Sequence, residues 1–134
     1  MDSRKIFLIE LHEIIKNSSK IRDQLAYPTE ENNRTEQFKL NIEEVAALKN
    51  YDFDDAALSA IEKIVRDNMM GAFFDAFSLM DAVGDPEIME VDKTWLGLTL
   101  LERKVDEEED DDVFLHDEFF EVYWDWLEQR KIDD

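Results

Sequence analysis

The sequence contains no cysteine and only three glycines and two prolines among its 134 residues. Without cysteine there is no disulfide framework, no thiolate metal site and no cysteine nucleophile. Neither a glycine-rich phosphate loop nor the nucleophile elbow of a hydrolase is present. Histidine, the usual acid–base residue at neutral pH, occurs only at His12 and His116, and no zincin spacing follows His12. We therefore predict a protein that is not an enzyme and that has no cofactor and no catalytic or metal-binding residues.

Basic residues are also scarce, because 15 Lys and Arg stand against 35 Asp and Glu, for a net charge of −20. Such a field repels nucleic acid and anionic lipid and attracts cationic partners. Residues 105–134 alone hold two basic and fourteen acidic residues, so the acidic pole is C-terminal. We predict a basic protein partner and no contact with nucleic acid or membrane.

Long apolar runs are missing as well. The longest early run, Ile6 to Ile9, is far too short for a signal-peptide core or a membrane span, which favours a cytoplasmic protein. The hydrophobic content of 44% lies close to the ordinary globular range, and the length fits one domain. We expect a single domain over residues 1–134, with a flexible acidic loop at 105–112.

The clearest element is a long helix from Asp54 to Val83. Asp54 or Asp55 can cap its start, while Gly84 offers a left-handed cap and Pro86 prevents continuation. Apolar residues recur at the three- and four-residue spacing of a buried helical face: Leu58, Ile61, Val65, Met69, Ala72, Ala76, Met80 and Val83. We expect this helix to lie at the centre of the fold.

Three further helices are predicted, over Ser3–Gln24, Asn41–Lys49 and Asp117–Lys131. The inward candidates of the first helix are Ile6, Ile9, Ile14, Ile21 and Leu25, and the Asn17-Ser18-Ser19 step favours a bend. Trp95–Leu101 is the best strand candidate, and Ile88, Met89 and Val91 could add a very short strand. The fold class is therefore mainly α, a single-domain helical bundle around a central long helix, or α+β with one short strand pair.

Seven consecutive acids form the first candidate site: Asp106, Glu107, Glu108, Glu109, Asp110, Asp111 and Asp112. Closely spaced carboxylates can hold Ca²⁺ or Mg²⁺, but the alternating acids and central glycine of an EF-hand loop are missing. We interpret the run as a solvated loop and partner-docking surface.

The second candidate lies on the central helix, where Asp67, Gly71, Asp75 and Ser78 share one face. These residues could line a cleft, or they could be the solvated face of the helix, with Gly71 letting a neighbouring backbone approach closely. Asp67 and Asp75 stand roughly 12 Å apart along the axis, which is too far for a tightly coupled acid–base pair.

The third candidate is the aromatic C-terminal helix, in which Tyr123, Trp124 and Trp126 stand among acidic residues. Tyr and Trp often anchor protein interfaces, and the acids favour a basic partner. We expect these three residues to bind the partner or to form a homodimer contact.

The block Phe73-Phe74-Asp75-Ala76-Phe77-Ser78-Leu79-Met80-Asp81 runs into Val83-Gly84-Asp85-Pro86. A Trp-bearing strand, an acidic loop and an aromatic helix are expected to follow. This order resembles small acidic immunity-type proteins encoded beside bacterial toxins. The resemblance covers the second half of the chain, and it implies stoichiometric docking onto one toxin. The turn in that block often reads Asp-Gly, whereas here Ala82 follows Asp81.

The sequence thus predicts a non-catalytic acidic module that docks onto a basic partner, in its sharpest form an immunity protein neutralising a toxin. A nucleic-acid mimic is one alternative, and it needs acids spread in rows over one face. A small metal-dependent enzyme needs carboxylates converging in a pocket. A structural or oligomeric protein would use its C-terminal aromatics to join subunits.

Overall fold

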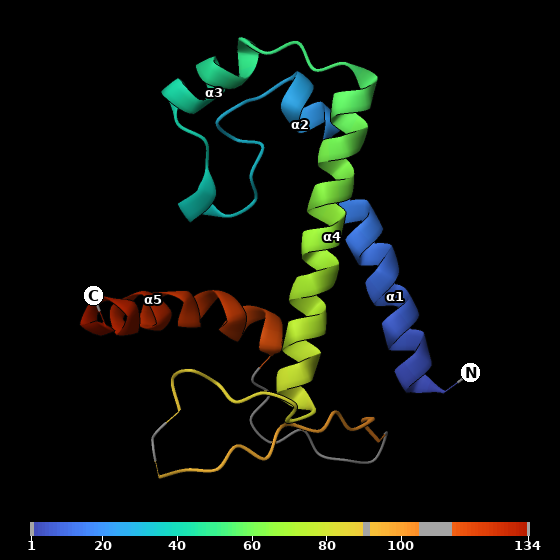
Figure 1. The fold of residues 1–134 in the computed structure, drawn as a ribbon, viewed down its shortest axis with the longest axis vertical. Helices are drawn as coiled ribbons and strands as arrows, with labels where there is room; N and C mark the ends of the chain where they lie inside the picture. The colour runs from blue at the N-terminus through green and yellow to red at the C-terminus, as the bar shows by residue number, and fades with distance from the viewer. Residues whose placement is uncertain (1, 90–91, 105–113, 134) are drawn as a thin grey trace. The chain divides into compact units, whose positions relative to one another are not determined.

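The computed structural model describes residues 2–89, 92–104 and 114–133, with the backbone alone at 129–133. The chain divides into two compact units, Met1–Leu100 and Leu101–Asp134. The described residues are mainly helical, which confirms the predicted mainly α fold class (Figure 1). The elements follow in the order α1 Ser3–Ser18, α2 Arg22–Ala26, the 3₁₀ helix η1 Glu36–Phe38, α3 Ile42–Lys49, α4 Asp55–Met80 and α5 Leu115–Asp133.

Helices α3 and α4 begin where the sequence predicts, because each has a side chain that caps its first turn. The carboxylate of Asp54 accepts a hydrogen bond from the backbone N–H of Ala57 at 2.7 Å. At α3, Asn41 accepts from the N–H of Glu44, whose side chain accepts in turn from the N–H of Asn41. This capping box satisfies two backbone donors that the helix itself leaves unpaired.

Helix α4 ends at Met80, earlier than the predicted Val83, and Ala82 takes the left-handed conformation expected of Gly84. Ala82 has φ 57°, the one positive φ at a non-glycine residue in the described part of the chain. Its N–H donates to the carbonyl of Leu79, and the N–H of Val83 donates to the carbonyl of Ser78. These two bonds form a Schellman motif, which requires the left-handed residue directly after the C-cap at Asp81.

The predicted strand Trp95–Leu101 is wrong, because its described residues form no strand. Part of the segment instead donates hydrogen bonds to the carbonyl groups at the C-terminal end of α4. The indole Nε1–H of Trp95 donates to the carbonyl of Leu79 at 2.7 Å, and the N–H of Leu98 donates to the carbonyl of Met80 at 2.9 Å. A strand needs a neighbour to pair with, whereas this segment finds its partner at the helix end. Ile88 lies in a turn, and Val91 is outside the described residues.

Gly97 permits this close packing. It has φ 83°, and a Cβ atom placed on it would collide with the carbonyl oxygen of Met80. The segment can therefore approach the helix end closely only with glycine here. With the bonds of Trp95 and Leu98 in place, each of the last four carbonyls of α4, at residues 77–80, accepts a hydrogen bond.

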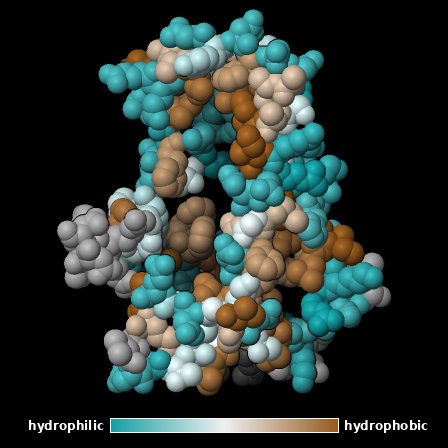
Figure 2. Space-filling view, viewed as in Figure 1, coloured by the Kyte–Doolittle hydropathy of each residue, from teal (hydrophilic) through white to brown (hydrophobic). Residues whose placement is uncertain are grey.

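The core of the first unit lies where α1 packs along α4 (Figure 1). Leu11 and Ile15 are buried, and the ring of Phe7 meets that of Phe77 edge to face at 6.3 Å. The buried face of α1 thus follows Phe7, Leu11 and Ile15. Three of the predicted inward residues, Ile6, Ile9 and Ile14, are about half exposed, because the position of α4 and not apolarity alone selects the buried face. Apolar side chains consequently show at the surface beside hydrophilic ones (Figure 2).

The predicted single helix Ser3–Gln24 is wrong, because the chain breaks at the Asn17-Ser18-Ser19 step: α1 ends at Ser18, and a separate helix α2 begins at Arg22. The Arg22 guanidinium lies 2.6 Å from the Glu62 carboxylate and 3.1 Å from that of Asp55, which joins α2 to α4. The N–H of Ile21 also donates to Glu62. The hydrogen bond to Glu62 is the main cause that raises the pKa of Arg22 above its ordinary value.

We expect Ala82→Gly to raise the free energy of unfolding by about 1 kcal/mol, because glycine adopts the left-handed conformation without the Cβ penalty. Ala76→Gly, on an exposed position inside α4, is the control and should lower stability by about 1 kcal/mol. Urea unfolding followed by circular dichroism measures both changes. A destabilised Ala82→Gly variant would contradict the Schellman geometry.

We expect Gly97→Ala to lower the free energy of unfolding by about 1–3 kcal/mol, because a Cβ atom would push the segment away from Met80 and strain its backbone. Gly84→Ala is the matched control. A Cβ on Gly84 meets nothing within 4 Å, so this change should be neutral or slightly stabilising. Thermal unfolding compares the pair, and equal melting temperatures would mean that the segment does not pack on α4.

Candidate functional site

The predicted partner-binding residues fall into two groups. Asp106–Asp112 lie outside the described residues, as does the predicted loop 105–112. Tyr123, Trp124 and Trp126 lie on α5, and the structure brings their rings together. The Tyr123 ring centroid is 5.4 Å from that of Trp124 and 5.7 Å from that of Trp126. The three aromatic residues therefore form one cluster, although the two tryptophans leave the helix in different directions.

The sequence of α5 separates apolar from acidic side chains around the helix. At about 100° per residue, its apolar positions cover roughly 200° of the circumference, and its acids gather within about 100° of the rest. We call the first group the apolar face: Leu115, Phe119, Phe120, Val122, Tyr123, Trp124, Trp126 and Leu127. The second group is the acidic stripe: Asp117, Glu118, Glu121, Asp125 and Glu128.

The apolar face is largely exposed. Phe119 is 73% exposed, Phe120 58%, Trp124 55% and Trp126 44%, whereas Tyr123 and Leu127 are half-buried. Uncovered aromatic area of this size is unfavourable in water and characteristic of surfaces that another molecule covers. All five members of the acidic stripe are exposed beside it.

The start of α5 suits acidic residues. The carbonyl of Phe114 accepts hydrogen bonds from the N–H groups of Asp117 and Glu118, both at 3.1 Å. The two carboxylates thus stand in the first turn, where the helix dipole favours negative charge. His116 lies 3.3 Å from the Asp117 carboxylate and packs its ring against Phe114, and His12 is exposed on α1.

The second predicted site, which lies on α4, is a solvated face of that helix. Asp67, Gly71 and Asp75 are exposed, and the Ser78 hydroxyl donates back to the carbonyl of Phe74 at 2.9 Å. A Cβ atom on Gly71 would have nothing within 4 Å. No neighbouring backbone in the described part of the chain therefore requires glycine at this position.

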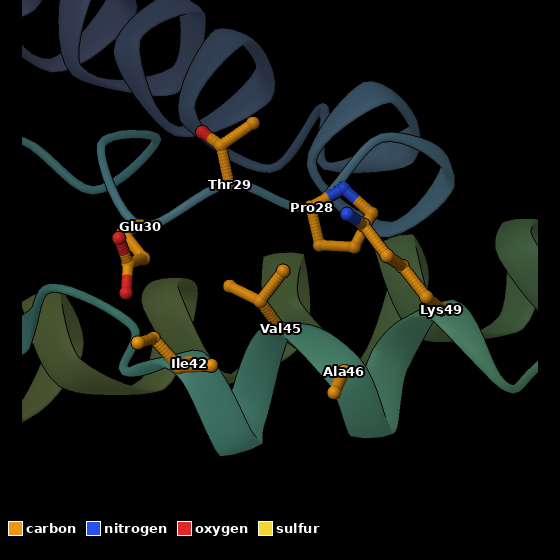
Figure 3. Close-up of a pocket in the computed structure, with 7 residues that line it drawn as sticks. All are labelled: Pro28, Thr29, Glu30, Ile42, Val45, Ala46 and Lys49. Carbon is orange, nitrogen blue, oxygen red and sulfur yellow. The ribbon is translucent and has the colours of Figure 1, made fainter.

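A shallow groove of about 370 Å³ separates the loop after α2 from α3 (Figure 3). Pro28, Thr29 and Glu30 line it from the loop; the side chains of Pro28 and Glu30 point toward α3, and that of Thr29 points away from it. The α3 side is formed by Ile42, Val45, Ala46 and Lys49. Its lining is mostly apolar with one acid and one base, and none of the residues that the sequence singles out belongs to it.

Within 2–89, 92–104 and 114–133, no three His, Asp or Glu side chains are grouped so that they could hold a metal ion. None of the helices described there is both long enough and apolar enough to cross a membrane.

The chain matches no protein-family model, no curated protein and no solved structure. Support for a binding site on α5 therefore comes from the geometry of that helix alone. The sequence pattern predicted Tyr123, Trp124 and Trp126 as partner-binding residues, which stays a prediction, and did not single out the acidic stripe. The spacing of the acids contained that signal, because Glu121 and Glu128 stand three residues before and four residues after Trp124.

We expect Gly71→Ala to raise the free energy of unfolding by about 1 kcal/mol, because alanine is the better helix former and its Cβ meets open space. Ala72→Gly, at the adjacent exposed position, is the reciprocal control and should lower stability by a similar amount. Chemical denaturation measures both. Destabilisation by Gly71→Ala would mean that another backbone packs against this face.

Proposed function

We propose that this chain is a non-catalytic binding module whose helix α5 docks onto a basic protein. The observation that carries the proposal is the exposed apolar face of α5 with the acidic stripe beside it. Aromatic side chains supply most of the binding energy in many protein interfaces, and adjacent charges select the partner. A surface that offers both favours a partner with an apolar patch bordered by Lys or Arg.

The net charge of −20 supports the same partner class. A field of this sign raises the rate at which a basic protein arrives, and salt weakens that effect. The aromatic residues act at short range and should control dissociation. We therefore assign the association rate of the complex to the acidic residues of α5 and its lifetime to the aromatic residues of the same helix.

The sharpest form of the proposal is an immunity protein that neutralises a toxin by stoichiometric docking. Its support is the resemblance described above, which extends from the Phe73–Asp81 block into the aromatic helix. A partner that itself binds DNA would make the acidic stripe a nucleic-acid mimic. The two forms share the same surface and differ in the identity of the partner.

Affinity capture from the lysate of the source organism tests the proposal. We expect the wild-type chain to retain one basic protein at a one-to-one ratio at low salt and to release it as salt rises. Suppression of that partner's toxicity on co-expression would support the immunity form. Retention that does not change with salt would contradict electrostatic docking.

Two variants of equal net charge show whether the docking charge is local to α5. Glu121→Gln, Asp125→Asn and Glu128→Gln together neutralise three members of the acidic stripe. Glu10→Gln, Asp67→Asn and Asp75→Asn neutralise three exposed acids on α1 and α4. We expect the first set to slow association with the captured partner several-fold more than the second. Equal rates for the two sets would contradict docking through α5.

A further inference from the structure

Trp124 occupies a special place on α5, at the border between the apolar face and the acidic stripe. Glu121 lies three residues before it and Glu128 four residues after it, so both are its neighbours on the helix surface. The indole is 55% exposed, and both glutamates are exposed. Neither carboxylate has an ion-pair partner among the residues whose side chains the structure describes.

An exposed indole between two carboxylates matches the chemistry of a guanidinium group. The flat guanidinium stacks on an aromatic face and at the same time donates paired hydrogen bonds to a carboxylate. A lysine ammonium is a compact, strongly hydrated charge that makes neither the stack nor the paired bonds equally well. From this chemistry we expect the arrangement to favour arginine over lysine.

Trp126 provides the contrast within the same cluster. It contacts the same tyrosine ring and is also exposed, but the residues three and four positions before it are Tyr123 and Val122. It thus lies within the apolar face, away from the border with the acidic stripe. A guanidinium stacked on Trp126 would find no carboxylate at either preceding helix-neighbour position.

We propose that Trp124, with Glu121 and Glu128, binds an arginine side chain of the basic partner. This inference rests on the proposed function and names the chemical group that the docking surface recognises. Trp124 supplies the stacking surface, and the two glutamates supply the hydrogen-bond acceptors. Trp126 and the rest of the apolar face contact apolar side chains of the partner.

Two nine-residue peptides, one all arginine and one all lysine, test the inference by calorimetric titration of the full-length protein at fixed ionic strength. We expect the arginine peptide to bind about two- to fivefold more tightly, the range of an exposed cation–π contact. Trp124→Leu should remove this preference, Trp126→Leu should keep it, and Trp124→Phe should retain part of it. Circular dichroism checks that each variant keeps its helix content.

The possible failures are distinguishable. If wild-type protein binds both peptides equally, or if the arginine preference survives Trp124→Leu, the arginine site is overturned while docking onto a basic partner stands. The arginine site is also overturned, and docking onto a basic partner still stands, if Trp126→Leu removes the preference as fully as Trp124→Leu. If neither peptide binds at low salt, the proposed function falls together with the arginine site.

Discussion

The C-terminal end of α4 is the constraint on which the structure of the first unit depends. A helix end leaves carbonyl groups without partners inside the helix, and each of them needs a donor. Here the donors come from two places, the Schellman turn at Ala82 and the distant residues Trp95 and Leu98. The second source ties the chain that follows α4 back to the helix. Glycine is required at position 97 for the same reason, since only the smallest residue lets the backbone approach the carbonyl of Met80 this closely.

A thin core is the second feature of the structure, because the packing of α1 on α4 buries few side chains completely. Leu11 and Ile15 are nearly inaccessible to water. Hydrophobic burial is the dominant favourable term in folding. The apolar area that stays exposed in the described residues therefore does not contribute to the stability of the fold. A binding partner that covers exposed aromatics would recover part of that free energy. Stability and binding are therefore linked, because a ligand that binds only the folded state stabilises it.

The proposed docking surface combines two kinds of interaction on one helix. The apolar face offers contact area that requires a close fit, and the acidic stripe acts over a longer range. In the proposed complex, their border at Trp124 is where both kinds of interaction meet one arginine side chain of the partner. This separation around the helix axis explains why a segment with aromatics and acids mixed along the sequence can still present an ordered surface. Aromatic and acidic residues that alternate along the sequence fall on different faces of the helix, since neighbouring residues lie about 100° apart around its axis.

The sequence by itself determined most of the helical segments and the starting points of α3 and α4. The caps at Asp54 and Asn41 and the break after Ser18 depend on residues within one turn of each other, so local patterns suffice to find them. It also predicted the aromatic part of the candidate site, because Tyr and Trp are recognisable by type. Only the tertiary structure decided which face of α1 is buried and that Trp95 closes a helix instead of joining a strand. Those outcomes depend on contacts between residues that are in some cases tens of positions apart, where burial and unpaired carbonyls outweigh local propensity.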